Sequence, residues 1–157
     1  YPLPEAQLDR FMFSINLTYP SFDEEVKVVK LTTSNAQSEV EVVFSAKEIL
    51  EFQTLIRKIP VADNVIEYAV KMVGKTRPNS SEALPLIKQY VDWGAGPRAS
   101  QNLILAAKTF SVIKGKFSPD IEDVQAVAVS ILRHRIIKNY KAEADGISVE
   151  TIIESLF

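Results

Sequence analysis

One short stretch of the sequence, Gly94-Ala95-Gly96-Pro97-Arg98, has residue types suited to binding an anion. The two glycines free the backbone, Pro97 presets a first helical residue, and Arg98 then falls in the first turn of a helix. A cation in that turn opposes the helix dipole unless an anion is present, which the free N–H groups and the guanidinium can bind together. The stretch therefore predicts an anion site at Arg98. The alternative is a surface arginine paired with Asp92.

A second arginine, Arg10, closes a predicted short helix over residues 4–10, immediately before a predicted strand. An arginine held stiffly at such an edge can reach a neighbouring subunit, where it would stabilise the charge on a phosphoryl group during transfer. The alternative is a surface ion pair between Asp9 and Arg10, which would contribute little to stability.

A third pattern, residues 69–76, matches a loose phosphate-binding loop but lacks the context that the chemistry requires. Such a loop follows a strand and opens a helix, so that its N–H groups surround the phosphates. Here the upstream residues form a predicted helix with Ala69 on its buried face, and Arg77-Pro78 prevents a second helix from starting. We interpret the stretch as a helix C-terminus capped by Gly74.

Helices dominate the elements expected to position these residues. Apolar periodicity and capping residues predict helices after Ser21, after Ser45 as far as Pro60, over 63–73, over 97–113, over about 119–133 with Ser118 as N-cap, and from Ser148. Alternation of apolar side chains predicts a half-buried strand over residues 11–19. A short strand over 40–44, a loop over 32–39 and a linker over 74–81 complete the prediction.

Composition limits the function classes. The 157 residues are 46% hydrophobic and 24% charged, as expected for one ordinary domain or two small lobes. The chain has no cysteine and one histidine, which excludes disulfides, thiolate zinc sites and a histidine-cluster metal site. The net charge of -2 gives no general attraction to nucleic acid, and no apolar run approaches the roughly 20 residues of a membrane span. Because the first residue is Tyr1, we expect a piece of a longer protein.

Two further features have ordinary structural interpretations. The basic cluster of Arg133, His134, Arg135, Lys138 and Lys141 is interpreted as complementing a helix dipole or contacting a subunit, with His134 a hydrogen-bonded structural residue. Trp93 is expected to pack against the core, although a place beside a nucleotide base is also open.

Four stretches, in this order along the chain, resemble the MoxR-type AAA+ ATPases. Residues 3–11, LPEAQLDRF, closely resemble the arginine-finger region of that family. Residues 94–100, GAGPRAS, resemble its sensor 2 motif, with Gly96 where many members have serine. Residues 117–124 and 129–135 resemble two further parts of the family's lid. The resemblance covers nearly the whole chain.

The resemblance implies a mainly α fold, in which a helical AAA+ lid bundle follows a short strand and helices from the end of the α/β ATPase core. Residues 1–35 would be the end of the core, residues 36–80 a connecting helical insertion, and residues 81–157 the lid with sensor 2.

The resemblance also implies roles for the two arginines. Arg10 would be the arginine finger, acting in trans on a neighbour's site, and Arg98, beside Pro97, would contact the γ-phosphate of ATP in cis or in trans. ATP and Mg2+ would lie between core and lid at a subunit boundary of a cytoplasmic ring, usually a hexamer. The family acts as a chaperone-like remodeller, often with a von Willebrand factor type A partner. Without a phosphate loop, an acidic magnesium motif or sensor 1, this chain alone should neither bind ATP tightly nor hydrolyse it, and it has no predicted metal ligand.

Two other functions remain open from the sequence. The chain could be an independent helical module that binds a partner through an exposed apolar helix face. Alternatively, the basic cluster could bind nucleic acid, which predicts binding that weakens steeply with salt.

Overall fold

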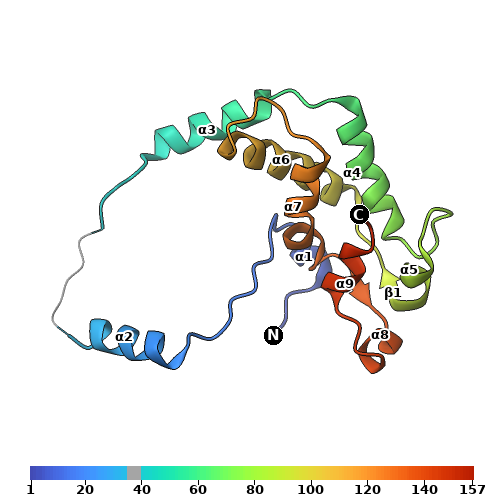
Figure 1. The fold of residues 1–157 in the computed structure, drawn as a ribbon, viewed down its shortest axis with the longest axis horizontal. Coiled ribbons are helices and arrows are strands. Elements are labelled where there is room, and N and C mark those ends of the chain that lie inside the picture. Colours follow the sequence, from blue (N-terminus) through green and yellow to red (C-terminus); the bar gives the residue numbers. More distant parts are fainter. Residues whose placement is uncertain (35–39) are drawn as a thin grey trace.

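The computed structural model describes residues 1–34 and 40–157, and helices dominate it (Figure 1). The helices are α1 (Glu5–Leu8), α2 (Phe22–Thr32), α3 (Ala46–Lys58), α4 (Asp63–Lys75), α5 (Pro85–Tyr90), α6 (Pro97–Ile113), α7 (Ile121–Leu132), α8 (Tyr140–Ala144) and α9 (Val149–Glu154). The strands β1 (Val91–Trp93) and β2 (Ile137–Lys138) pair antiparallel. The expected mainly helical lid bundle is confirmed. Most of the loop predicted over residues 32–39 lies outside the described residues.

The hydrophobic core lies among α4, α6, α7 and α9. Leu103 of α6, Ile131 of α7 and Ile152 of α9 are fully buried, and α6 and α7 pack along each other. Helix α4 joins the same core through Ala69 and Met72. The core therefore includes residues from both sides of the boundary expected between residues 80 and 81. The burial of Ala69 within a helix agrees with our rejection of a phosphate loop.

Helices α2 and α3 lie outside this core and bury no residue. Figure 1 shows α2 set apart from the bundle, whereas α3 runs beside α6. Both helices begin with the predicted capping boxes: the carboxylate of Glu24 accepts from the backbone N–H of Ser21 at 2.8 Å, and that of Glu48 from Ser45 at 2.7 Å. Local hydrogen bonds therefore define where these helices start, although little tertiary packing supports them.

The strand predicted over residues 11–19 is wrong. The segment is extended, but within the described part of the chain the backbone of residues 13–19 makes one hydrogen bond, from Ser14 N–H to Ser130 O at 2.8 Å. Ile15 and Leu17 are exposed. The alternation of apolar residues indicates that one face of the segment can be buried. A β-strand also needs a neighbouring strand to bond with, and none lies beside this segment among the described residues. The short strand predicted over residues 40–44 is absent for the same reason.

Two helix ends differ from prediction. The N-cap of α7 is Asp120, not Ser118, because Asp120 and Asp123 accept each other's backbone N–H groups, each at 3.1 Å. Helix α4 continues through Gly74, and Thr76 is its C-cap. Side-chain bonding at the following residues, not the flexibility of Gly74, therefore ends α4.

Residues 74–81 are not a free linker. Thr76 is fully buried, and its Oγ1 donates to Val73 O at 2.7 Å and accepts the N–H of Ala95 at 2.9 Å. The Nε of Arg77 donates to Ala95 O at 3.0 Å. These bonds fix the turn that precedes α6 against the end of α4, so the first turn of α6 has a rigid support.

None of the helices in residues 1–34 and 40–157 combines the length and apolar character needed to cross a bilayer.

The two glycines of the turn provide a matched test of this support. A Cβ atom built on Gly94 would lie 2.4 Å from the carbonyl oxygen of Thr76, whereas one on Gly96 would meet nothing within 4 Å. We expect Gly94→Ala to lower the free energy of unfolding by about 1–3 kcal/mol because the backbone must shift. Gly96→Ala causes no clash and should cost at most about 1 kcal/mol, because alanine is a poorer N-cap than glycine. Urea unfolding of both variants measures this, and equal stabilities would contradict the close approach.

Candidate functional site

Arg98 lies in the first turn of α6, as predicted. The N-cap is Gly96, with φ of −87°, and no side chain caps the helix, so the first-turn N–H groups have no side-chain acceptor. The Arg98 side chain is 47% exposed. Its Nη1 donates to Oδ2 of Asp9, 89 positions earlier in the chain, and not to the expected Asp92. The first turn of α6 therefore already binds one anionic group, the carboxylate of Asp9.

Asp9, which follows α1, bonds two arginines with one carboxylate. Oδ2 accepts from Arg98, and Oδ1 accepts from Nε of Arg135 at 2.9 Å. We call this arrangement the Asp9 bridge. It replaces the surface pair between Asp9 and Arg10 that the sequence left open, and it joins the start of α6 to the end of α7.

Arg135 is the functional residue that sequence analysis missed. Only 5% of it is exposed, and all five guanidinium N–H groups have acceptors. Besides Asp9 Oδ1, the acceptors are the carbonyls of Asp9 at 2.9 Å, Phe11 at 2.6 Å, Met12 at 3.4 Å and Ile131. Burial lowers the pKa of this guanidinium, and the hydrogen bond that it donates to Asp9 opposes that shift. No local pattern signals such a residue, because its acceptors lie more than 120 positions away, except for Ile131 O at the end of α7, four positions earlier.

His134 supports the same segment, and its predicted structural role is confirmed. Its Nε2 lies 3.0 Å from Phe11 O and its Nδ1 is buried without a partner. Because a carbonyl can only accept, Nε2 bears a proton, and the neutral ring is favoured because Nδ1 has no acceptor among the described residues. Burial is the main cause that lowers the pKa of His134.

Arg10 lies between Asp9 and Phe11, whose carbonyls Arg135 binds, yet its own side chain takes no part in this network. It is exposed and makes no hydrogen bond or ion pair with the described residues. Its backbone N–H donates to Gln7 O at 3.1 Å. The structure therefore brings the segment that bears Arg10 to Arg98 through the Asp9 bridge, and it leaves the Arg10 guanidinium free to meet another molecule.

Most of the basic cluster at 133–141 is neutralised inside the chain. Arg133 pairs with Glu150 at 2.9 Å, Lys138 pairs with Glu143 at 2.9 Å, and Arg135 pairs with Asp9. These ion pairs remove the exposed positive surface that nucleic-acid binding would need.

Two clefts adjoin the start of α6. One, of about 320 Å³, is lined by residues that include Asp9, Trp93, His134 and Arg135. The other, of about 390 Å³, is lined by Arg77, Asn79, Trp93, Pro97 and their neighbours. Trp93 borders both and is 70% exposed, so the expected packing of Trp93 against the core is wrong.

This arrangement can bind one end of a phosphate chain. The uncapped first turn of α6 and the half-exposed Arg98 are the groups that hold phosphate at helix N-termini, and Pro97 sets where that turn begins. Asp9 must compete with any second anion for Arg98. Both oxygens of Asp9 already accept from arginines, so this carboxylate is not free to bind magnesium.

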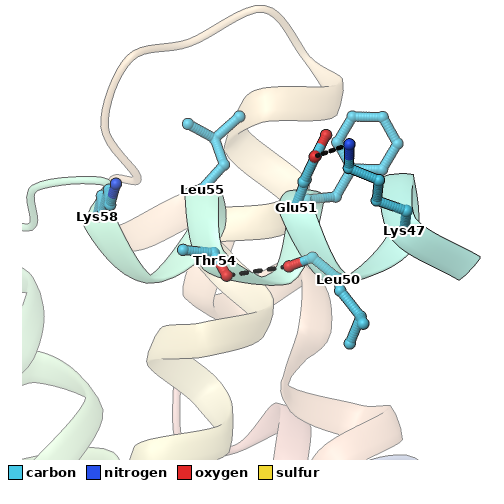
Figure 2. A pocket seen from close by; sticks show the side chains of 7 residues that line it. Lys47, Leu50, Glu51, Thr54, Leu55 and Lys58 are labelled. Atoms are coloured by element: carbon cyan, nitrogen blue, oxygen red, sulfur yellow. Dashed lines mark hydrogen bonds and ion pairs between the residues drawn. The ribbon is translucent and has the colours of Figure 1, made fainter.

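A separate surface lies on α3. Figure 2 shows Leu50 and Leu55 projecting from opposite sides of this helix, with Lys47 and Glu51 paired at 3.8 Å. These four residues and Phe52 line a shallow pocket on the surface of α3. The exposed apolar side chains of α3 are the feature that best fits the alternative of a protein-interaction module.

Comparisons with known proteins relate the chain to an AAA lid domain and to a MoxR chaperone. Residues 85–156 match the model of the AAA lid domain. The chain is 37% identical over 160 residues to Chaperone MoxR1 of Mycobacterium tuberculosis, covering 98% of this chain and 40% of that protein. It is 33% identical over 157 residues to the uncharacterized protein YeaC of Bacillus subtilis, covering 99% of this chain and 46% of that protein.

A solved structure of a candidate ATPase from Cytophaga hutchinsonii has the same fold. It superposes with a TM-score of 0.88 and 38% identity, over 99% of this chain and 48% of that chain. The chain thus spans less than half the length of each of these relatives.

The neutral, half-buried ring of His134 predicts how acid affects stability. Because its pKa in the folded protein lies below the ordinary 6.5, the unfolded chain binds more protons as the pH falls past that value, and the folded state loses stability. We expect the free energy of unfolding to fall from about pH 7 to about pH 5 more steeply in the wild type than in His134→Gln, whose amide can still donate to Phe11 O. Urea unfolding at several pH values measures the difference, and identical slopes would contradict a half-buried neutral ring.

Proposed function

We propose that this chain, which belongs to the MoxR-type AAA+ family, forms the lid-bearing part of a protein that couples ATP binding and hydrolysis to chaperone-like remodelling or maturation of partner complexes. The observation that carries the proposal is Arg98. It lies at an uncapped helix start in the region that matches the AAA lid domain, half exposed and already bound to a carboxylate.

Arg98 would act as sensor 2, bound to the γ-phosphate of ATP. A guanidinium that binds a carboxylate can also bind phosphate, because its fork of N–H donors matches both anions. Pro97 would contribute by fixing the first turn, next to the cleft that Trp93 borders. ATP supplies the phosphoryl group for transfer, and Mg2+ would be held by residues outside this chain. Alone, the chain would neither bind ATP tightly nor hydrolyse it.

Arg10 would act as the arginine finger for a neighbouring subunit. Its guanidinium has no partner among the described residues, whereas the backbone on either side of it is held by Arg135. A cation presented on a fixed backbone can stabilise the charge that develops on a phosphoryl group during transfer, at little cost in reorganisation.

The remaining proposals follow from these two roles. A finger in trans requires a homo-oligomer, which we propose to be a cytoplasmic hexameric ring with a von Willebrand factor type A partner. We also propose the division of the chain into residues 1–35 at the end of the core, 36–80 as a connecting insertion and 81–157 as the lid, with the last helix of the insertion, α4, packed on the lid core.

A second candidate is an independent helical interaction module. The exposed apolar side chains of α3 favour it. Such a module would not distinguish ATP from ADP, so the response of nucleotide binding to changes at Arg98 separates the two functions.

Arg10→Ala in the full-length protein tests the finger. We expect ATP hydrolysis to fall by about a thousandfold or more, because transition-state charge loses its cation, while nucleotide affinity stays within about twofold. Steady-state hydrolysis and binding of a fluorescent nucleotide measure the two effects. Arg57→Ala removes another exposed guanidinium that has no partner in residues 1–34 and 40–157, and it should leave both unchanged. Activity of Arg10→Ala near the wild-type level would exclude the role.

Arg98→Ala in the full-length protein tests the sensor. We expect the affinity for a non-hydrolysable ATP analogue to fall about 10- to 100-fold, with a much smaller change for ADP, because only the analogue has a γ-phosphate. Titration calorimetry measures both affinities. The difference in lid position between the ATP-bound and ADP-bound states should also decrease. Equal losses for the two nucleotides would place Arg98 away from the γ-phosphate.

A further inference from the structure

The segment that bears Arg10 is fixed to the end of α7 within its own chain. The buried guanidinium of Arg135 binds the carbonyls of Asp9, Phe11 and Met12, and Nε2 of His134 donates to Phe11 O. Two residues further on, Ser14 N–H donates to Ser130 O at 2.8 Å. Because these hydrogen bonds all hold the backbone of residues 9–14, the segment has little freedom to move independently of α7.

The two bonds of the Asp9 bridge differ in their access to water. The Arg135 side chain is 1% exposed, whereas that of Arg98 is 47% exposed. Breaking the inner bond would leave a buried, uncompensated guanidinium, which is strongly unfavourable. The outer bond is half in water and can be exchanged for another anion at little cost. Of the two arginines, Arg98 is therefore the one that can leave Asp9.

We propose that Asp9 is a positioning residue that couples Arg98 to Arg10: its carboxylate holds Arg98 in the absence of a phosphate and gives it up when a phosphate binds there. This inference rests on the proposed roles of Arg98 and Arg10. A phosphate and the carboxylate repel each other, so the ion pair of Arg98 with Asp9 weakens when a phosphate binds to the same guanidinium. When Arg98 turns to the phosphate, Asp9 keeps only Arg135.

The consequence reaches the neighbouring residue, Arg10. Residues 9–12 lose the outer of the two side-chain bonds that hold Asp9, and the position from which Arg10 extends changes with the occupancy of the site at Arg98. By linkage, anything that fixes Arg10 against a neighbouring subunit must in turn alter the affinity at Arg98. The two proposed phosphate-binding arginines would thus respond to each other through a single carboxylate.

Nucleotide affinity of the full-length protein tests the bridge. Asp9→Asn keeps an oxygen that can accept from Nε of Arg135 but removes the charge that competes for Arg98. We expect Asp9→Asn to bind a non-hydrolysable ATP analogue about two- to fivefold more tightly than the wild type, the range set by a half-exposed ion pair. The gain should disappear in the Arg98→Ala background, because the two changes act on one interaction. Asp92→Asn removes a nearby exposed charge that pairs with none of the residues the structure describes, and its effect should not depend on Arg98.

Hydrogen–deuterium exchange supplies a second readout that does not depend on the Asp9 variant. In the wild-type protein, amide exchange across residues 9–14 should rise when the ATP analogue replaces ADP, and this rise should be absent in Arg98→Ala. If Asp9→Asn fails to fold, as judged by circular dichroism, this measurement decides alone.

The outcomes separate the inference from the function on which it rests. If Arg98→Ala weakens analogue binding but Asp9→Asn leaves it unchanged or weakens it, the coupling is wrong and the sensor role stands. If neither change alters analogue binding, both the coupling and the sensor role of Arg98 are wrong. Exchange across residues 9–14 that is the same with the analogue and with ADP would also overturn the coupling.

Discussion

The buried guanidinium of Arg135 is the constraint on which the arrangement of the site depends. A charged group with 5% of its surface exposed is strongly destabilising unless its hydrogen bonds are made and its charge is balanced. The chain meets this requirement with one carboxylate and four carbonyl groups. Three of those carbonyls belong to residues 9–12, so this segment must lie against the end of α7. The place of Asp9, and with it the partner of Arg98, follows from that requirement.

Local signals predicted the elements that depend on local interactions. Helix α6 runs from Pro97 to Ile113, the bounds that the proline, the glycines and the apolar spacing predicted. The capping boxes at Ser21 and Ser45 form as expected, because their donors and acceptors lie three residues apart. The N-cap of α7 was misplaced by two residues because Ser118 and Asp120 both precede suitable first turns. The reciprocal bonds between Asp120 and Asp123 decide between them.

Predictions that needed a distant partner were less successful. The sequence identified Arg98 as a residue that requires an anion, but it offered Asp92, six positions away, in place of Asp9. It found the alternation over residues 11–19 without being able to say whether a strand lies beside it. Arg135 was read as one member of a basic cluster, since burial is invisible in a list of charges. In each case the residue type was informative and the missing fact was which remote segment the fold brings to it.

The unequal exposure of the Asp9 bridge matters for what Arg98 can do. Had Arg98 been as buried as Arg135, a phosphate would have to displace Asp9 against a penalty of several kcal/mol, and the first turn of α6 would be closed to nucleotide. Had Asp9 been absent, Arg98 would stand free in water, and binding a phosphate there would alter nothing in residues 9–12. A half-exposed pair, worth about 0.2–1 kcal/mol, lies between these limits. It is weak enough for a phosphate to replace. Because its carboxylate also belongs to the buried network of Arg135, its loss is transmitted to the backbone beside Arg10.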